Sequence, residues 1–169
     1  MRQSTAAIEF VTLTEQSDST DVIIDTTGVS AGEYTLMLES FNTLSIAKSA
    51  LKKDTITITV TAPPSFTETL TSEVVTAGTA TSWTLPEIDD GYYELSNVQV
   101  VPPVSLDSYI TYDSATRQIS FSDDDGSKPL AGSSYTISIT LVNTNGDESV
   151  YGQTLQVMAP PSFVDDLIA

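Results

Sequence analysis

The sequence predicts an all-β fold of antiparallel β-sandwich domains in tandem, and three observations support this. Apolar residues alternate with threonine and serine over 135–141 and 56–60, which places the apolar side chains on one face of each strand. Clusters of Gly, Pro, Asn and Asp separate such runs at short intervals. The segment Ala-Pro-Pro-Ser-Phe at 62–66 recurs letter for letter at 159–163. Short alternating strands between turns are typical of a sandwich, and the recurrence indicates more than one copy.

The recurrence also predicts the domain boundaries. Ser65 and Ser162 are 162 − 65 = 97 residues apart, a length that suits a self-contained domain rather than a solenoid unit. The match continues upstream, where residues 32–38 align with 132–139. We therefore expect the C-terminal part of one sandwich over 1–62, a complete sandwich over 63–159, and over 160–169 the first strand of a following repeat or a donor strand for another copy.

The strands of the complete domain follow from the order of alternating runs and turns. They are expected at 66–70, 73–76, 81–85, 92–101, 109–113, 118–122, 133–143 and 151–158. The turn at 89–91 precedes the run 92–101 and Pro102-Pro103 ends it, because proline disfavours continued strand pairing. The Asp-rich turn 123–126 and the Asn-rich turn 143–147 bound the long strand between them.

Two further local features are expected. The stretch 46–53, rich in Ala, Leu and Lys, is the only helix-like segment and is expected to form one or two helical turns in the longer loop of the first copy. Tyr135, shortly after Gly132, is placed like a tyrosine corner, whose hydroxyl bonds to backbone upstream of the strand. Tyr34 after Gly32 has the same placement.

Composition and charge exclude several classes of function. The 169 residues include 6 Lys+Arg and 23 Asp+Glu, a net charge of −17, so nucleic acid and anionic membrane surfaces are poor partners. No apolar run approaches the roughly 18 residues of a spanning helix, so we expect no direct membrane insertion in this segment. The sequence lacks His and Cys, which excludes Ser/His/Asp triads, thiol chemistry and disulfides. No carboxylate pair is singled out for glycoside hydrolysis, and we expect no enzymatic activity.

Five runs carry a resemblance to a known family: 83–89, 106–113, 116–121, 132–141 and 151–157. They resemble dystroglycan-type cadherin-like repeats, above all the tandem versions on very large surface proteins of bacteria and of protists such as ciliates. The resemblance implies an Ig-like, cadherin-like β-sandwich in an extracellular array that spaces, adheres or polymerises. True cadherins carry Asp-rich calcium linkers and an Asp-Arg-Glu triplet, whereas this linker is Ala-Pro-Pro-Ser-Phe and the triplet is missing. This departure argues against interdomain calcium of the cadherin kind.

Acidic residues in turns and near the C-terminus are the candidates for a metal site. The candidate ligands are Asp89, Asp90, Asp147, Glu148, Asp165 and Asp166. Calcium accepts six to eight oxygen ligands from scattered loops, so these acids would form a calcium site if they converged at one pole of the sandwich. The alternative is that they are solvated acids that keep the surface charged, and that the chain holds no cofactor.

Aromatic residues suggest an alternative function. Tyr92, Tyr93 and Tyr109 are candidate contacts for a sugar ring, as in a carbohydrate-binding accessory module. Tyr92 and Tyr93 adjoin a turn and, in a strand, would point to opposite faces, which would expose one of them. Trp83 alternates with Leu85 and is expected to pack in the core instead.

The proline pairs give the predicted mechanism. Pro63, Pro64, Pro160 and Pro161 restrict the backbone between domains and favour a semi-rigid rod. Phe66 and Phe163 follow these pairs and are expected to bury their rings in the next domain or at the junction. The sequence therefore predicts a structural or adhesive repeat module of an extracellular or cell-surface protein. Its expected partners are other copies of the repeat or of itself, head to tail, or surface glycans or proteins, with a calcium-stabilised adhesion module as a further alternative.

Overall fold

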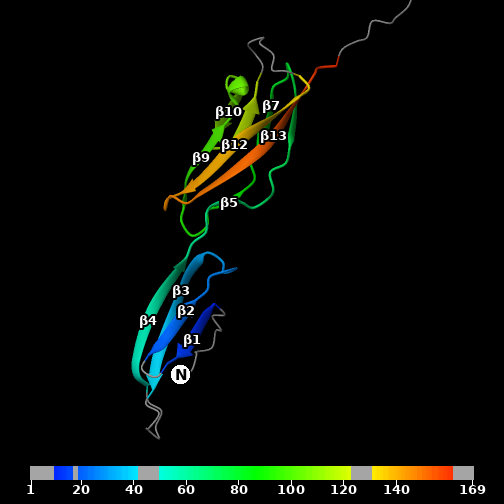
Figure 1. Cartoon of the computed structure of the whole chain (residues 1–169). Helices are drawn as coiled ribbons and strands as arrows, with labels where there is room; N and C mark the ends of the chain where they lie inside the picture. The colour runs from blue at the N-terminus through cyan, green and yellow to red at the C-terminus, as the bar shows by residue number, and fades with distance from the viewer. Residues whose placement is uncertain (1–9, 17–18, 42–49, 123–130, 162–169) are drawn as a thin grey trace, which may run out of the picture. The chain divides into compact units, whose positions relative to one another are not determined.

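A computed structural model describes residues 10–16, 19–41, 50–122 and 131–161 of the chain (Figure 1). The chain divides into two compact units, Met1–Ala62 (unit 1) and Pro63–Ala169 (unit 2). Strands make up nearly all of its regular structure. In the described ranges, no helix has the length and apolar character needed to cross a membrane.

Unit 2 is an Ig-like β-sandwich. Its elements are β5 (Ser65–Phe66), β6 (Glu73–Thr76), β7 (Thr81–Thr84), β8 (Ile88–Asp89), β9 (Leu95–Val101), the 3-10 helix η1 (Val104–Leu106), β10 (Ile110–Asp113), β11 (Gln118–Phe121), β12 (Ser133–Asn143) and β13 (Glu148–Met158). One sheet has the order β6-β13-β12-β9 and the other β10-β11-β7, while β5 pairs with β8. An Ig-like sandwich places its strands in the orders C-F-G and B-E-D, which β9-β12-β13 and β7-β11-β10 reproduce.

The core of unit 2 lies between these two sheets. It is formed by the inward positions of the strands, which alternate with polar outward positions as the sequence predicts, and by Leu106 of η1. Phe121 and Ile119 of β11 and Ile137 and Ile139 of β12 are fully buried within it. The two sheets therefore bury one continuous apolar layer.

Unit 1 repeats part of this arrangement. Its elements are β1 (Val11–Glu15), β2 (Thr20–Ile24), β3 (Gly32–Phe41) and β4 (Ala50–Val60), paired β1-β2 and β3-β4. Tyr34 of β3 faces Ile58 of β4, as Tyr135 of β12 faces Leu155 of β13. The pair β3-β4 is thus equivalent to β12-β13, and β1-β2, which precedes it, is equivalent to β10-β11.

The inner face of unit 1 is more exposed than its counterpart in unit 2. Ile24 ends β2 as Phe121 ends β11, yet Ile24 is 42% exposed and Phe121 0%. Ile56 of β4 is 40% exposed, whereas Gln153 at the equivalent position of β13 is 3% exposed. In unit 2 these positions are covered because β7 and β9 extend the two sheets. The described residues of unit 1 include no strand in either place.

Most predicted strands are confirmed, and the helix is wrong. Residues 50–53 begin β4 instead, and 46–49 lie outside the described residues. The pairing with β3 overrides the local helix preference, because Lys53 lies opposite Glu39 and forms an ion pair with it. Three bounds differ by more than one residue: 67–70 and 92–94 are not strand, and β13 begins three residues before 151.

The tyrosine corner is observed in unit 1. The Tyr34 hydroxyl donates a hydrogen bond of 2.9 Å to the carbonyl oxygen of Ser30, which ties the start of β3 to the chain before it. The Phe10 ring packs edge-on against Tyr34, with centroids 5.0 Å apart, and so links β1 to β3. The residues 123–130, upstream of Tyr135, lie outside the described part of the chain.

Candidate functional site

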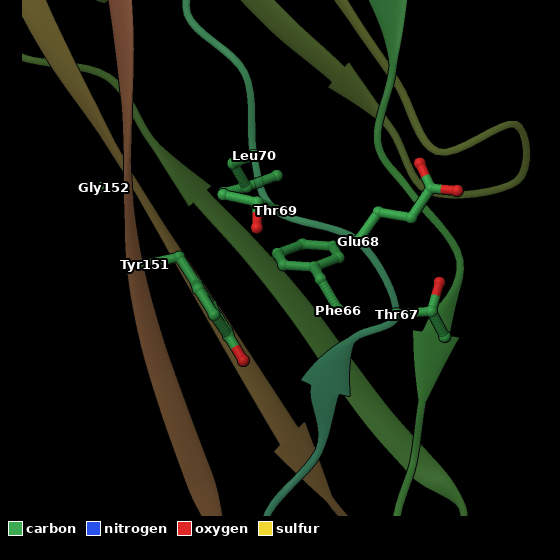
Figure 2. Close-up of a pocket in the computed structure, with 7 residues that line it drawn as sticks. All are labelled: Phe66, Thr67, Glu68, Thr69, Leu70, Tyr151 and Gly152. Carbon is green, nitrogen blue, oxygen red and sulfur yellow. The ribbon is translucent and has the colours of Figure 1, made fainter.

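A groove opens in unit 2 beside the part of β13 that does not pair with β6. The parallel β6-β13 pairing covers only Leu155 to Met158, so the chain before β6 leaves the edge of β13 free near Tyr151 and Gly152. The groove of about 360 Å³ lies between these residues and 66–70 (Figure 2). Phe66 and Tyr151 meet edge to face across it, with centroids 4.9 Å apart, while the Glu68 carboxylate extends away from Tyr151.

A buried amide fixes the wall of this groove. The Gln153 side chain on β13 accepts a hydrogen bond of 3.1 Å from the Trp83 indole N–H and donates one of 3.1 Å to the carbonyl oxygen of Thr71. Trp83 lies on β7 in the opposite sheet and packs against the core, in agreement with its expected role. Gln153 therefore joins both sheets to the segment that precedes β6.

The acidic candidates have hydrogen-bonded roles in turns. The Asp147 carboxylate accepts hydrogen bonds from the side-chain amides of Asn143 and Asn145, and the Asn143 side-chain oxygen accepts bonds from the backbone N–H groups of Asn145 and Asp147. The Asp89 carboxylate accepts one from the N–H of Gly91. No group of three or more potential metal ligands occurs within the described residues.

The remaining calcium candidates are not all within the described residues. Asp90 follows β8 and Glu148 begins β13, while Asp165 and Asp166 lie outside the described residues. The calcium site therefore stays a prediction. The melting temperature with and without EDTA checks it, because an ion bound only by the folded chain raises that temperature.

The structure places the three candidate sugar contacts in different surroundings. Tyr109 is only 7% exposed and its ring stacks on Phe121 with centroids 6.2 Å apart, so it is a core residue. Tyr92 and Tyr93 lie in a turn rather than on opposite faces of a strand, and their rings touch edge to face at 5.2 Å. Tyr92 is exposed and Tyr93 half-buried. A sugar contact at Tyr92 or Tyr93 stays a prediction.

The linker residues differ in burial. Pro63 is exposed, whereas Pro64 is fully buried and Phe66 half-buried. Pro160 and Pro161 are exposed after the end of β13, and Phe163 lies outside the described residues. The Phe66 ring packs within unit 2 against Tyr151. The first proline pair thus leads directly into the packed part of unit 2.

Tyr112 on β10 is a buried titratable group with a testable pH dependence. Its hydroxyl is buried without a hydrogen-bond partner in the described structure, and burial raises the pKa of this phenol despite the opposing effect of Arg117. We expect Tyr112→Phe to leave the free energy of unfolding at pH 7 unchanged or to raise it by up to about 1 kcal/mol, because no partner is lost.

The sign of the Tyr112 effect at high pH follows from its raised pKa. Above the ordinary value of 10.0 the unfolded phenol loses its proton before the folded one, so stability falls as pH rises toward the raised folded pKa. Chemical denaturation between pH 8 and pH 11 should show a smaller decrease in the free energy of unfolding for Tyr112→Phe than for the wild type. Equal losses would show that this phenol does not contribute to the pH dependence.

Sequence reasoning did not identify the groove or the amide bridge. Gln153 had a usable signal, since it is a lone amide among the inward apolar positions of a strand, where Leu155 and Val157 follow it. Tyr151 and Gly152 had no such signal in the sequence, because their place in the groove depends on where the pairing between β6 and β13 ends. That stop is set by packing between segments about 80 residues apart.

Comparisons with known proteins give structural neighbours only. No protein-family model matches the sequence, and no curated protein matches it either. Among solved structures, it is similar to immunoglobulin domains 1–4 of Sidekick-1 (18% identity, 90% of this chain and 38% of that chain, TM-score 0.42). It is also similar to tandem Ig repeats of Dlar (12% identity, 94% and 81%, TM-score 0.41) and to EC1–4 of PcdhgB3 (12% identity, 87% and 38%, TM-score 0.40). The chain thus spans less than half the length of the Sidekick-1 chain it matches.

Proposed function

We propose that the chain is a non-catalytic structural or adhesive repeat module of an extracellular or cell-surface protein. One observation supports a spacing role above all: β6, the first strand of unit 2 that joins the larger sheet, pairs in parallel with the last strand, β13. Parallel neighbours run in the same direction, so the chain enters unit 2 at one pole and leaves at the other (Figure 1). A module of this kind adds length to an array with each repeat.

The duplicated hairpin and the proline pairs extend this proposal to a tandem array. The pairs β3-β4 and β12-β13 share register and are each followed by Ala-Pro-Pro-Ser-Phe. Proline fixes φ and restricts the residue before it, so Ala62-Pro63-Pro64 has few conformations available. We propose that these links make the array a semi-rigid rod whose partners are further copies of the repeat, head to tail.

The rigidity of the link is tested by spin-label distances. The sequence has no Cys, so labels at Thr57→Cys and Thr111→Cys, both exposed positions, report only on the two units. We expect a narrow distance distribution that broadens at least twofold when Ala62 and Pro63 are both replaced by Gly. The matched control replaces Pro160 and Pro161 by Gly. These prolines lie outside the labelled span, so the control should leave the width of the distance distribution unchanged. A wild-type distribution as broad as that of the Gly variant would contradict the rod.

The groove favours carbohydrate binding as a second candidate function. Aromatic faces with neighbouring hydroxyls suit sugar rings, and Phe66, Tyr151, Thr67 and Thr69 supply these groups. A glycan array with the whole chain tests this candidate, followed by Tyr151→Ala on any glycan bound. Loss of binding would support the groove, whereas Tyr93→Ala should have no effect. An array without signal would remove this candidate and leave the spacing role untouched.

A further inference from the structure

One face of unit 2 is almost free of charge. It is the outer face of the β6-β13-β12-β9 sheet, formed by alternate residues 74–76, 97–101, 134–142 and 150–158, and we call it the neutral face. These positions hold only Val, Met, Thr, Ser, Asn, Gln and Gly. The charged residue on the same side is Glu148, at the start of β13.

The rest of unit 2 makes this face unusual. Residues 63–169 hold 15 of the 23 acids and two of the six basic residues, so their net charge is 2 − 15 = −13. Apart from Glu148, none of the acids within the described residues lies on the neutral face. Their near absence leaves one surface through which two strongly acidic bodies can approach without bringing carboxylates together.

Exposed apolar side chains concentrate on the same face. Val74, Val101, Val150 and Met158 are exposed there, and Val150 is 67% exposed. Gly152 leaves no side chain projecting from the centre of the face. A Cβ at this position would lie 3.1 Å from the Thr136 methyl, which is closer than an ordinary contact. The face is therefore flat, with valine side chains standing among hydroxyl and amide groups.

We propose that the neutral face is a docking surface for the neutral face of a second copy of this chain. The charge distribution points to this partner, since two neutral faces can meet without bringing the carboxylates of two acidic chains together. Two such faces stack as sheets about 10 Å apart, and a two-fold axis makes the contact self-complementary. The inference deepens the proposed adhesive role by naming the partner and its contact.

The size of the face sets the strength of the contact. Four strands about 4.8 Å apart and some eight residues long cover on the order of 500 Å² per copy. The total of roughly 1,000 Å² is at the lower limit for a specific interface, so the dimer is weak and concentration-dependent. Because two bodies of equal negative charge repel, added salt should strengthen the contact, as the Debye length falls from about 30 Å at 0.01 M to about 10 Å at 0.1 M.

Sedimentation equilibrium of the whole chain tests the proposal. In 0.15 M salt we expect the weight-average mass to rise with concentration from one copy toward two, and to rise less in 0.01 M salt. Val150→Asp, on the neutral face, should lower the association constant at least tenfold. The matched control is Val104→Asp on η1, which is 95% exposed, lies off this face and adds the same charge. It should leave the association constant within about twofold of the wild type.

Three results would overturn the proposal. A wild-type chain that stays monomeric up to millimolar concentration would remove the second copy as the occupant. Equal weakening by Val104→Asp and Val150→Asp would show that net charge, and not this face, controls association. Dimers unaffected by Val150→Asp would place the contact elsewhere. Both valines are exposed, so neither variant should unfold unit 2, and the spin-label test of the linker is independent of all three results.

Discussion

Replacing Ile119 by alanine is expected to lower the free energy of unfolding of unit 2 by about 3–5 kcal/mol. Ile119 is fully buried on β11, where it pairs with Trp83 of β7 and Tyr112 of β10. Truncation removes three methyl and methylene groups from a packed layer and leaves a cavity, so both transfer and cavity costs apply. Urea unfolding, followed by the Trp83 fluorescence that reports on unit 2, measures the change.

The matched control is Ile24→Ala in unit 1. It removes the same atoms from the equivalent strand β2, but Ile24 is 42% exposed. We expect a cost of at most about 1.5 kcal/mol, because much of the side chain already contacts water. Hydrogen exchange of the unit 1 amides measures it, as the only tryptophan is in unit 2. Equal costs at the two positions would contradict the difference in burial between the units.

Replacing Gln153 by leucine is expected to cost unit 2 about 2–3 kcal/mol although it makes the core more apolar. The substitution leaves the Trp83 N–H and the Thr71 carbonyl without the partner that holds them at 3.1 Å. Both hydrogen bonds are partly buried, so an unpaired group there loses part of its hydration without compensation. The same urea titration measures the effect, with circular dichroism as the signal because the environment of Trp83 changes.

A double-mutant cycle separates the bridge from packing. Trp83→Phe removes the indole donor, so the cost of Gln153→Leu should fall by about 1–2 kcal/mol in that background. The remaining cost belongs to the Thr71 carbonyl. Additive costs would mean that the hydrogen bond to Trp83 does not stabilise unit 2.

Period-two patterning made most of the fold predictable. The strands at 73–76 and 133–143 are found with the expected bounds, because apolar alternation and turn residues agree at their ends. The helix expected over 46–53 is wrong at residues 50–53, because helix-forming composition is a local signal while the pairing of Lys53 with Glu39 depends on another strand. The strand expected at 66–70 ends at Phe66 because only packing decides where the chain leaves the sheet.

The candidate sites were less predictable than the strands. Residue type and position in a turn identified Asp89 and Asp147 as candidate ligands. Their hydrogen bonds to Gly91 and to Asn143 depend on turn geometry, which the sequence does not give. Tyrosine is a residue type that also occurs at surfaces, so residue type alone did not decide the burial of Tyr109. The structure buries it, because η1 folds the chain onto the core. Faces assembled from four strands, such as the neutral face, become visible only when strand order and register are known.

A spacer that enters at one pole and leaves at the other is loaded through its two ends, so pulling on single molecules tests the proposed spacing role of unit 2 most directly. Force between Thr61→Cys and Ala159→Cys shears the parallel β6-β13 pair, so all its hydrogen bonds are loaded together. The matched geometry pulls between Ala131→Cys and Ala159→Cys, where the Gly132 N–H bonds to Val157 and the antiparallel β12-β13 pair opens one bond at a time.

We predict that the shear geometry unfolds at several times the force of the opening geometry. Complete unfolding between Thr61 and Ala159, a span of 159 − 61 = 98 residues, should release on the order of 300 Å of chain. Equal unfolding forces in the two geometries would contradict the proposed spacing role. So would gradual extension, without a force peak, when the chain is pulled between Thr61 and Ala159.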